Sequence, residues 1–106
     1  MTRRRERVEA SVAQLAADFL ARAGAVKALV TVTRVRMSDD YREATVFLSV
    51  LPVAMESEAV RSAKRARSDL REYMRKHSRL HPAPTVDFEL DYGEKNRQRI
   101  DDLTRS

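Results

Sequence analysis

The sequence predicts an α+β fold in which helices pack on one face of a three-stranded sheet. Two segments, residues 4–22 and about 55–76, show apolar residues at helical spacing. Three others are rich in valine, threonine or aromatic residues and read as strands. At 106 residues the chain has the length of one domain, so we take residues 1–106 as a single unit.

The opening helix is amphipathic, with one apolar face made by Val8, Val12, Leu15, Ala16, Phe19 and Leu20. Gly24 follows it, and glycine adopts the left-handed conformation past a helix end at little cost. Residues 1–7 form a basic arm that can extend a basic surface through Arg3, Arg4 and Arg5.

The next two segments predict an antiparallel hairpin. The first strand, residues 28–37, changes its apolar face halfway, with Val30 and Val32 on one side and Val35 and Met37 on the other. A one-residue bulge near Thr33 or Arg34 would reconcile the two halves. Residues 38–40 are typical of a turn, and the second strand alternates from Ala44 to Val50 before Pro52 ends it.

The long middle helix has an apolar face of Val60, Ala63, Ala66, Leu70, Tyr73 and Met74. On a straight helix Arg67 would lie at the edge of that face, where a guanidinium without a partner is costly to bury. We therefore expect a bend at Ala66-Arg67-Ser68, with Ser68 as the N-cap of a second segment that starts at Asp69. Amide groups exposed at such a bend would attract an anion.

The last strand, residues 85–92, alternates cleanly and directs a negative row of Asp87, Glu89 and Asp91 away from the core. That row would repel phosphate, and Phe47 is the main aromatic side chain expected on the open face of the sheet. A nucleic acid should therefore meet the helical side. Residues 94–106 form a short polar tail.

Basic residues gather on the outer side of the middle helix. Between residues 61 and 79 eight basic side chains meet only two acidic ones, and the eight are Arg61, Lys64, Arg65, Arg67, Arg71, Arg75, Lys76 and Arg79. A solvated helix usually mixes charges of both signs, since opposite pairs stabilise it. The excess indicates a polyanionic partner, and the net charge of +5 agrees with this.

Several function classes are disfavoured. The chain has no cysteine, so disulfides, thiolate metal sites and a cysteine nucleophile are excluded. His77 and His81 have a metal-like spacing, but Pro82 makes helical geometry there improbable. With only two glycines there is no phosphate-cradling loop, and no apolar run approaches the roughly 18 residues that span a membrane. We expect no catalysis, no metal and no cofactor.

Three stretches resemble the ribosome-binding factor A family: "RVEASVAQLAADFL", "VTVTRVRMSDDYREATVFLSVL" and "PTVDFELDYGEKNRQRIDDL". The resemblance implies a type II KH-like fold, α-β-β-α-(kink)-α-β. It also implies binding to the small ribosomal subunit and its precursor 16S rRNA during late maturation and 5′-end processing. The family marks its kink with Ala-x-Gly, and Ser68 stands at the glycine position here, which bears on the sharpness of the kink.

We therefore expect a cytoplasmic, monomeric, noncatalytic module that binds rRNA through the basic helical face, with other assembly factors as further partners. Two alternatives stay open. The same face could meet an acidic protein surface in an adaptor, or the chain could be an unrelated DNA-binding domain, because a fold alone does not settle function.

Overall fold

The computed structural model describes residues 2–24 and 27–93. The elements follow the order α1 (Thr2–Ala23), β1 (Leu29–Met37), β2 (Glu43–Leu51), the short 3₁₀ helix η1 (Val53–Met55), α2 (Glu56–Arg65), α3 (Arg67–His77) and β3 (Thr85–Leu90). The predicted α+β class and the α-β-β-α-(kink)-α-β order of a type II KH-like fold are confirmed.

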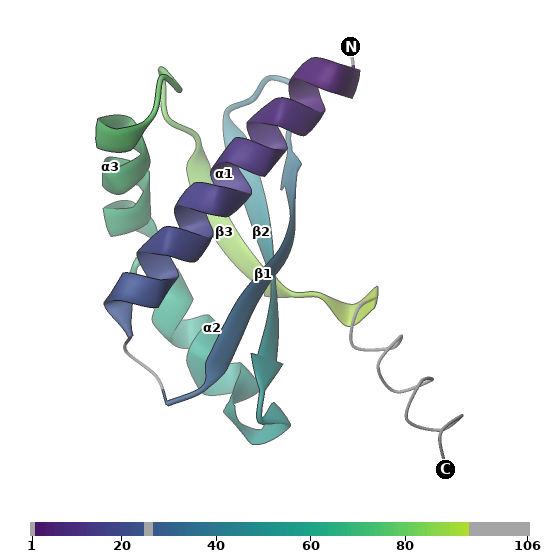
Figure 1. Ribbon diagram of the computed structural model, residues 1–106, viewed down its shortest axis with the longest axis vertical. Helices are drawn as coiled ribbons and strands as arrows, with labels where there is room; N and C mark the ends of the chain where they lie inside the picture. Colours follow the sequence, from purple (N-terminus) through teal and green to yellow (C-terminus); the bar gives the residue numbers. More distant parts are fainter. Residues whose placement is uncertain (1, 25–26, 94–106) are drawn as a thin grey trace.

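Helix α1 lies diagonally across one face of the sheet (Figure 1). Its side chains Val12 and Ala16 are completely buried, because they lie on the apolar face that the spacing predicts. Gly24 follows the helix with φ of 49°, the left-handed conformation expected at a C-terminal cap. Residues 2–7, which we expected as a basic arm, are part of α1.

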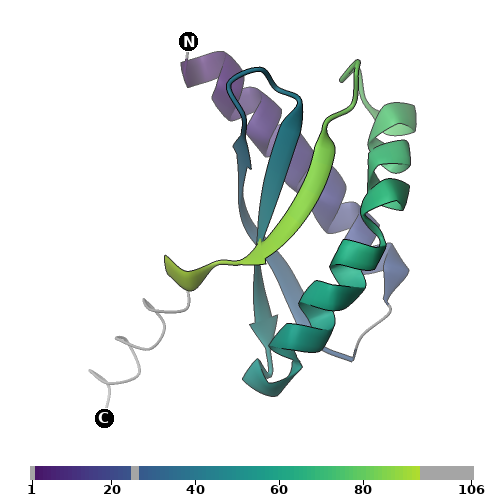
Figure 2. The same cartoon turned by 180° about the vertical axis from the view of Figure 1, so that it is seen from behind.

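The sheet has the order β1-β2-β3, with β1 antiparallel and β3 parallel to β2. The register shifts between Val32 and Arg34, so the predicted bulge is present and Thr33 is the extra residue. Beyond the bulge Val35 and Met37 turn toward the helices and are buried. The other face of β1 and β2 carries no helix among the described residues (Figure 2).

The middle helix is broken at Ala66, so the bend that we expected at Ala66-Arg67-Ser68 is present. The Ser68 N-cap is wrong, however. Helix α3 already begins at Arg67, its cap residue is Ala66, and no side chain caps it. The Ala66 amide bonds the Ala63 carbonyl at 3.0 Å, and the Leu70 amide bonds the Ala66 carbonyl at 2.9 Å. The turn thus closes through the backbone, and Ser68 lies inside the helix.

The core lies between the sheet and the helices. Its completely buried large side chains come from every layer and are Val12, Val46, Leu48, Leu70, Met74 and Phe88. Burying such apolar groups is the main favourable contribution to folding. No helix in the described ranges is both long and apolar enough to cross a membrane.

The acidic row of β3 differs from the prediction. The strand ends at Leu90, and Asp91 is 7% exposed instead of facing solvent. Its carboxylate accepts a hydrogen bond from the Thr33 hydroxyl and lies 3.4 Å from Nε of Arg34. These partners offset the cost of burying a charged side chain. They come from β1, so the alternation of residues along β3 could not predict that Asp91 is buried.

Candidate nucleic-acid interface

Two basic residues of the predicted surface converge on one carboxylate of β3. Lys64, from the end of α2, lies 2.7 Å from Oδ1 of Asp87, and Arg67, the first residue of α3, lies 3.1 Å from the same atom. Partial burial raises the pKa of Asp87, but hydrogen bonds from Lys64, the Phe88 amide and Arg67 outweigh it, so the pKa lies below its ordinary value. Through these two ion pairs Asp87 connects the end of α2 and the start of α3 to the edge strand β3.

Arg71, one turn further along α3, has a different role. Its Nε donates to the carbonyl oxygen of Ala83 at 3.1 Å, which ties α3 to the loop before β3. A guanidinium has five N–H donors, so this bond leaves others for a ligand.

Arg75 pairs with Glu72 on the same helix, with Nε 3.0 Å from Oε2. The hydrogen bond from Arg75 lowers the pKa of Glu72, and the same bond raises the pKa of Arg75. Both groups are exposed, and an exposed pair of this kind is a weak interaction that solvent and salt screen.

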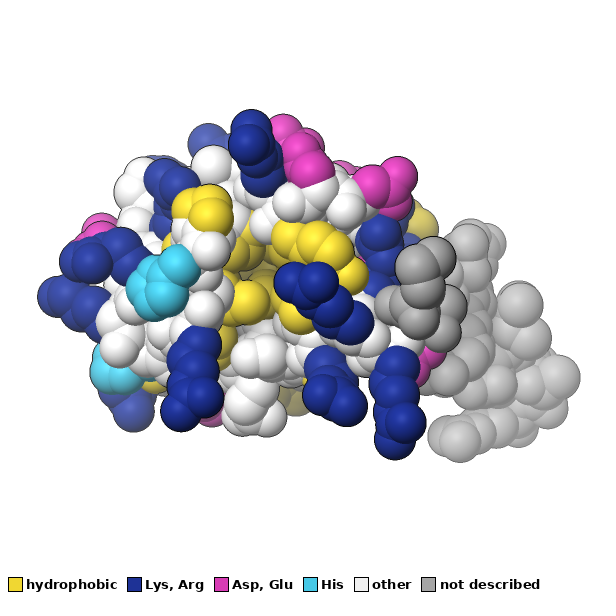
Figure 3. All heavy atoms as spheres, turned by 90° about the horizontal axis from the view of Figure 1, so that it is seen from above, with side chains coloured by type: hydrophobic (Ala, Val, Ile, Leu, Met, Phe, Trp, Pro, Cys, Tyr) yellow, Lys and Arg dark blue, Asp and Glu magenta, His cyan; other side chains and the backbone are white. Residues whose placement is uncertain are grey.

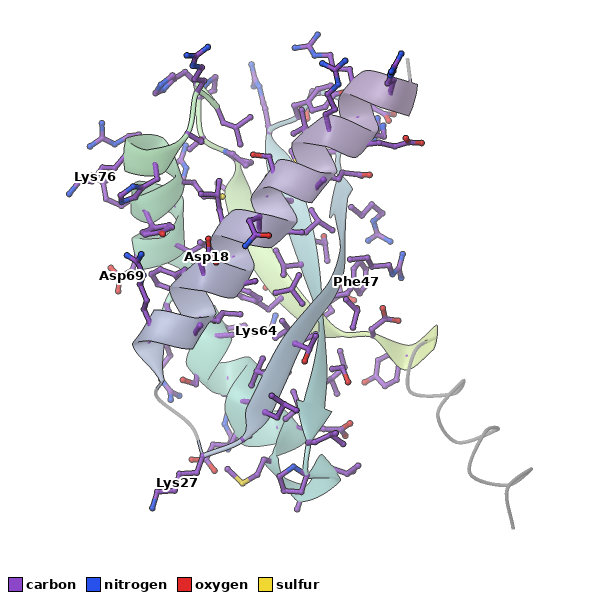
Figure 4. All side chains as sticks on the ribbon, in the orientation of Figure 1. Asp18, Lys27, Phe47, Lys64, Asp69 and Lys76 are labelled. Carbon is purple, nitrogen blue, oxygen red and sulfur yellow. The ribbon has the colours of Figure 1, made fainter. Side chains whose placement is uncertain are left out.

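The remaining cations have no carboxylate partner among the described residues; they are Arg61, Arg65, Lys76 and Arg79. Lys76 projects from the outer side of α3, away from the sheet (Figure 4). Asp69 lies on this outer side as well. Helices α2 and α3 together carry seven cations and four carboxylates, Glu56, Glu58, Asp69 and Glu72, which leaves an excess of three positive charges on the two helices.

A groove follows α3 on the side that faces β3. It consists of two hollows of about 520 and 310 Å³ that share Ser68 and Arg71. We call it the α3 groove. Its helical wall consists of Arg67, Ser68, Arg71, Glu72 and Arg75, and residues of β2, β3 and the loop before β3, among them Glu43 and Asp87, form the other wall. Arg65 and Arg79 lie outside it, in hollows on other sides of the molecule. The structure thus brings together only part of the predicted set.

The N-terminal arginines gather at the end of the molecule where the β1–β2 turn lies. Arg5 donates to the Met37 carbonyl at 2.6 Å and pairs with Asp39 at 2.8 Å, so it fastens α1 to the turn. Arg4 and Arg5 both lie over the ring of Tyr41, at 5.3 and 5.7 Å from its centroid. Arg3 is exposed.

Two cations that sequence reasoning missed lie on the open face of the sheet. The guanidinium carbons of Arg34 and Arg36 are 3.9 and 5.3 Å from the centroid of the Phe47 ring. The predicted bulge could have identified these two arginines. Because Val35 and Met37 face the core beyond the bulge, the residues that alternate with them, Arg34 and Arg36, must face outward. The open face is therefore basic beside β1 and acidic only toward β3, and the expected repulsion of phosphate does not extend over all of it.

No group of three or more potential metal ligands occurs within the described part of the chain. Helix α3 ends at His77, so the helical spacing toward His81 is not continued. The ring of His77 lies instead beside Tyr73, with the two ring centroids 4.3 Å apart and the planes tilted.

Comparisons with known proteins agree with this fold. The family model described as ribosome-binding factor A matches residues 4–104. A ribosome-binding factor A of Gemmatimonas aurantiaca is 32% identical over 105 residues, which is 95% of this chain and 72% of that protein. A second, from Fervidobacterium nodosum, is 34% identical over 82 residues, 76% of this chain and 66% of that protein.

Solved structures show the same arrangement. The crystal structure of ribosome-binding factor A from Thermus thermophilus has a TM-score of 0.74 at 23% identity, over 81% of this chain and 94% of that one. The solution structure of a ribosome binding factor A candidate from Thermotoga maritima has a TM-score of 0.68 at 30% identity, over 81% and 85% of the two chains.

Proposed function

Because this chain belongs to the ribosome-binding factor A family, we propose that it binds the small (30S) ribosomal subunit through its precursor 16S rRNA, during late maturation and 5′-end processing. Membership of the family implies a ribosome as partner and a role in ribosome biogenesis as a binding factor, not as an enzyme. Bacterial ribosomes are assembled in the cytoplasm, where we expect the protein to act as a monomer.

One observation carries the RNA part of the proposal: helices α2 and α3 keep an excess of three positive charges after their own four carboxylates are counted. Excess cations repel one another, and a phosphate backbone relieves that repulsion while releasing its counterions.

The α3 groove offers donors of three kinds to a phosphate backbone. Arg71 has N–H groups left after its bond to Ala83. Arg75 can exchange its exposed carboxylate partner for a phosphate at small cost. The first amides of α3 have no side-chain cap and lie at the positive end of the helix dipole, beside Ser68 in the groove wall. The remaining predicted cations would add unspecific attraction from outside the groove.

The test is association with subunits by sucrose-gradient sedimentation. We expect Arg71→Glu/Arg75→Glu to lose most co-sedimentation with small subunits. Arg22→Glu/Lys27→Glu makes the same change in net charge at exposed residues outside the groove and should retain co-sedimentation. Thermal unfolding of both variants checks that the fold persists. Equal co-sedimentation of the two double variants would contradict the proposal.

Ribonuclease separates the proposal from the adaptor alternative. Release of the protein from immature subunits by limited ribonuclease treatment is expected for an rRNA contact. Retention on the ribosomal proteins after digestion would instead favour an acidic protein surface. A preference for duplex DNA over rRNA fragments would favour the DNA-binding alternative.

A further inference from the structure

A second hollow lies at the end of the molecule where α1 begins, away from the α3 groove. It has a volume of about 430 Å³, in the range of pockets that hold small ligands. Three segments far apart in sequence line it: the start of α1, the β1–β2 turn and the loop between α3 and β3. Seen from this end, apolar side chains line the hollow and basic side chains stand around it (Figure 3).

The floor of this hollow is apolar and firmly held. Met37 and Pro84 are buried, and Val8, Tyr41 and Leu80 are half-buried. The lining loop is anchored, because Ser78 donates to the Met74 carbonyl at 2.7 Å and accepts from the Leu80 amide at 3.2 Å. A preformed apolar floor of this kind suits a flat, weakly polar ring.

The rim is cationic, with one arginine from each of the three segments: Arg4, Arg42 and Arg79. All three are exposed, and none forms an ion pair with a carboxylate of the described residues; the charge of Arg42 acts on Asp40 from a longer distance and contributes to the lowering of its pKa. Asp40 is the one acidic residue of the lining. Its Oδ1 is engaged by the Ser38 hydroxyl at 2.7 Å and the Arg42 amide at 3.1 Å, and these bonds lower its pKa. The three arginines and the one aspartate of the lining therefore sum to a net charge of two positives.

Two aromatic rings, Tyr41 and His81, complete the lining. Tyr41 has φ of 60°, a conformation that glycine or asparagine adopts far more readily than a bulky residue. A tyrosine at such a position, with Arg4 and Arg5 over its ring, is consistent with a use for that ring, since strained backbone concentrates at functional sites.

We infer that this hollow takes one unpaired nucleotide of a single-stranded RNA segment, with the base on the apolar floor beside Tyr41 and the flanking phosphates on Arg4, Arg42 and Arg79. Single-stranded RNA is recognised by such a combination of aromatic faces and a basic rim. A duplex cannot enter, because its bases are stacked and paired. The inference rests on the proposed function and adds to it a site that selects single strands.

The binding experiment uses the full chain and a five-residue oligoribonucleotide, followed by fluorescence anisotropy. Arg42→Glu/Arg79→Glu should weaken binding about tenfold and reduce the salt slope by roughly 1.4, for two phosphates lost on a single strand. The charge-matched Arg22→Glu/Lys27→Glu should change affinity less, because Arg22 lies in the last turn of α1 and Lys27 lies at the opposite end of the molecule from the hollow (Figure 4). Equal loss in both double variants would overturn the inference.

The ring is tested separately from the charge. Tyr41→Leu should weaken binding at least about fivefold, the low end of the effect of removing one stacking aromatic side chain, while Tyr41→Phe retains affinity. Full affinity in the folded Tyr41→Leu variant would overturn the base contact. The Arg42/Arg79 variant changes only exposed side chains, so it remains informative if Tyr41→Leu does not fold.

Amide chemical shifts locate the ligand. The pentanucleotide should shift amides of residues 37–42 and 79–81, and a duplex of the same sequence should not. Inorganic tripolyphosphate producing the same shifts would show a charge patch only and overturn the inference. The two failures are distinguishable: the proposed function fails if Arg71→Glu/Arg75→Glu leaves subunit binding intact, whereas this inference fails if single-strand binding ignores Arg42, Arg79 and Tyr41.

Discussion

Oγ1 of Thr33 donates a hydrogen bond to Oδ2 of Asp91 at 2.5 Å, joining two residues 58 positions apart in the chain. Thr33 is the extra residue of the β1 bulge, and Asp91 follows directly after β3. The same hydroxyl lies 3.3 Å from the carbonyl oxygen of Phe47 on β2. One side chain thus connects the bulge to β2 and to the residue that follows β3.

Thr33→Val removes this donor while keeping the shape of the side chain. We expect a loss of about 1–3 kcal/mol in the free energy of unfolding, because the carboxylate of Asp91 stays buried with one hydrogen bond fewer. Thr33→Ser keeps the hydroxyl and is the control. Denaturant titration measures both, and equal stability of the valine and serine variants would show that the bond contributes nothing.

The pairing of Asp87 with Lys64 and Arg67 predicts a pH-dependent contribution to stability. Because the pKa of Asp87 in the fold is below its ordinary 3.8, the contribution is complete above that value and disappears as the pH falls through the lower pKa. The side chain is 47% exposed, so the contribution is less than about 1 kcal/mol.

Asp87→Asn measures this contribution. Its deficit in unfolding free energy relative to the parent chain should be present at pH 7 and shrink toward pH 3. Glu89→Gln, an exposed change on the same strand, is the control. A deficit that stays constant or grows on acidification would contradict the assignment of the ion pair.

Ser68 allows a direct test of the helix break. Since Ser68 lies within α3 and caps nothing, Ser68→Ala should leave the free energy of unfolding unchanged or slightly raised. A genuine N-cap would lose about 1 kcal/mol on the same change. Ser68→Gly restores the glycine of the family pattern and should cost about 0.5–1 kcal/mol, as glycine does in a helix interior. Thermal and denaturant unfolding distinguish these outcomes.

Local patterns were sufficient for most of the fold. Apolar spacing located α1 and the α2–α3 segment, Gly24 indicated the end of α1, and the change of face between Val32 and Val35 indicated the bulge. The helix break could also be predicted, because on a straight helix Arg67 would lie at the edge of the apolar face. Its position within Ala66-Arg67-Ser68 is confirmed, but the expected cap was two residues off, because backbone hydrogen bonds at Ala66 close the turn where serine propensity favoured Ser68.

The candidate site was only partly accessible in this way. Periodicity assigned the basic residues to the outer side of the helices, but it could not show that Asp87 holds Lys64 and Arg67, 23 and 20 positions away. Periodicity also could not show that Arg4, Arg42 and Arg79 line one hollow, because the three residues come from segments far apart in the sequence.

By itself, then, the amino-acid sequence determined the elements, their faces, the family and the excess of positive charge. Tertiary structure alone decided which carboxylates neutralise which cations, why Asp91 is buried and where single arginines converge. The physical reason is range. Helical and strand periodicity arises from neighbours a few residues apart, whereas ion pairs, buried polar contacts and hollows depend on strand order, and the parallel placement of β3 beside β2 brings distant segments together.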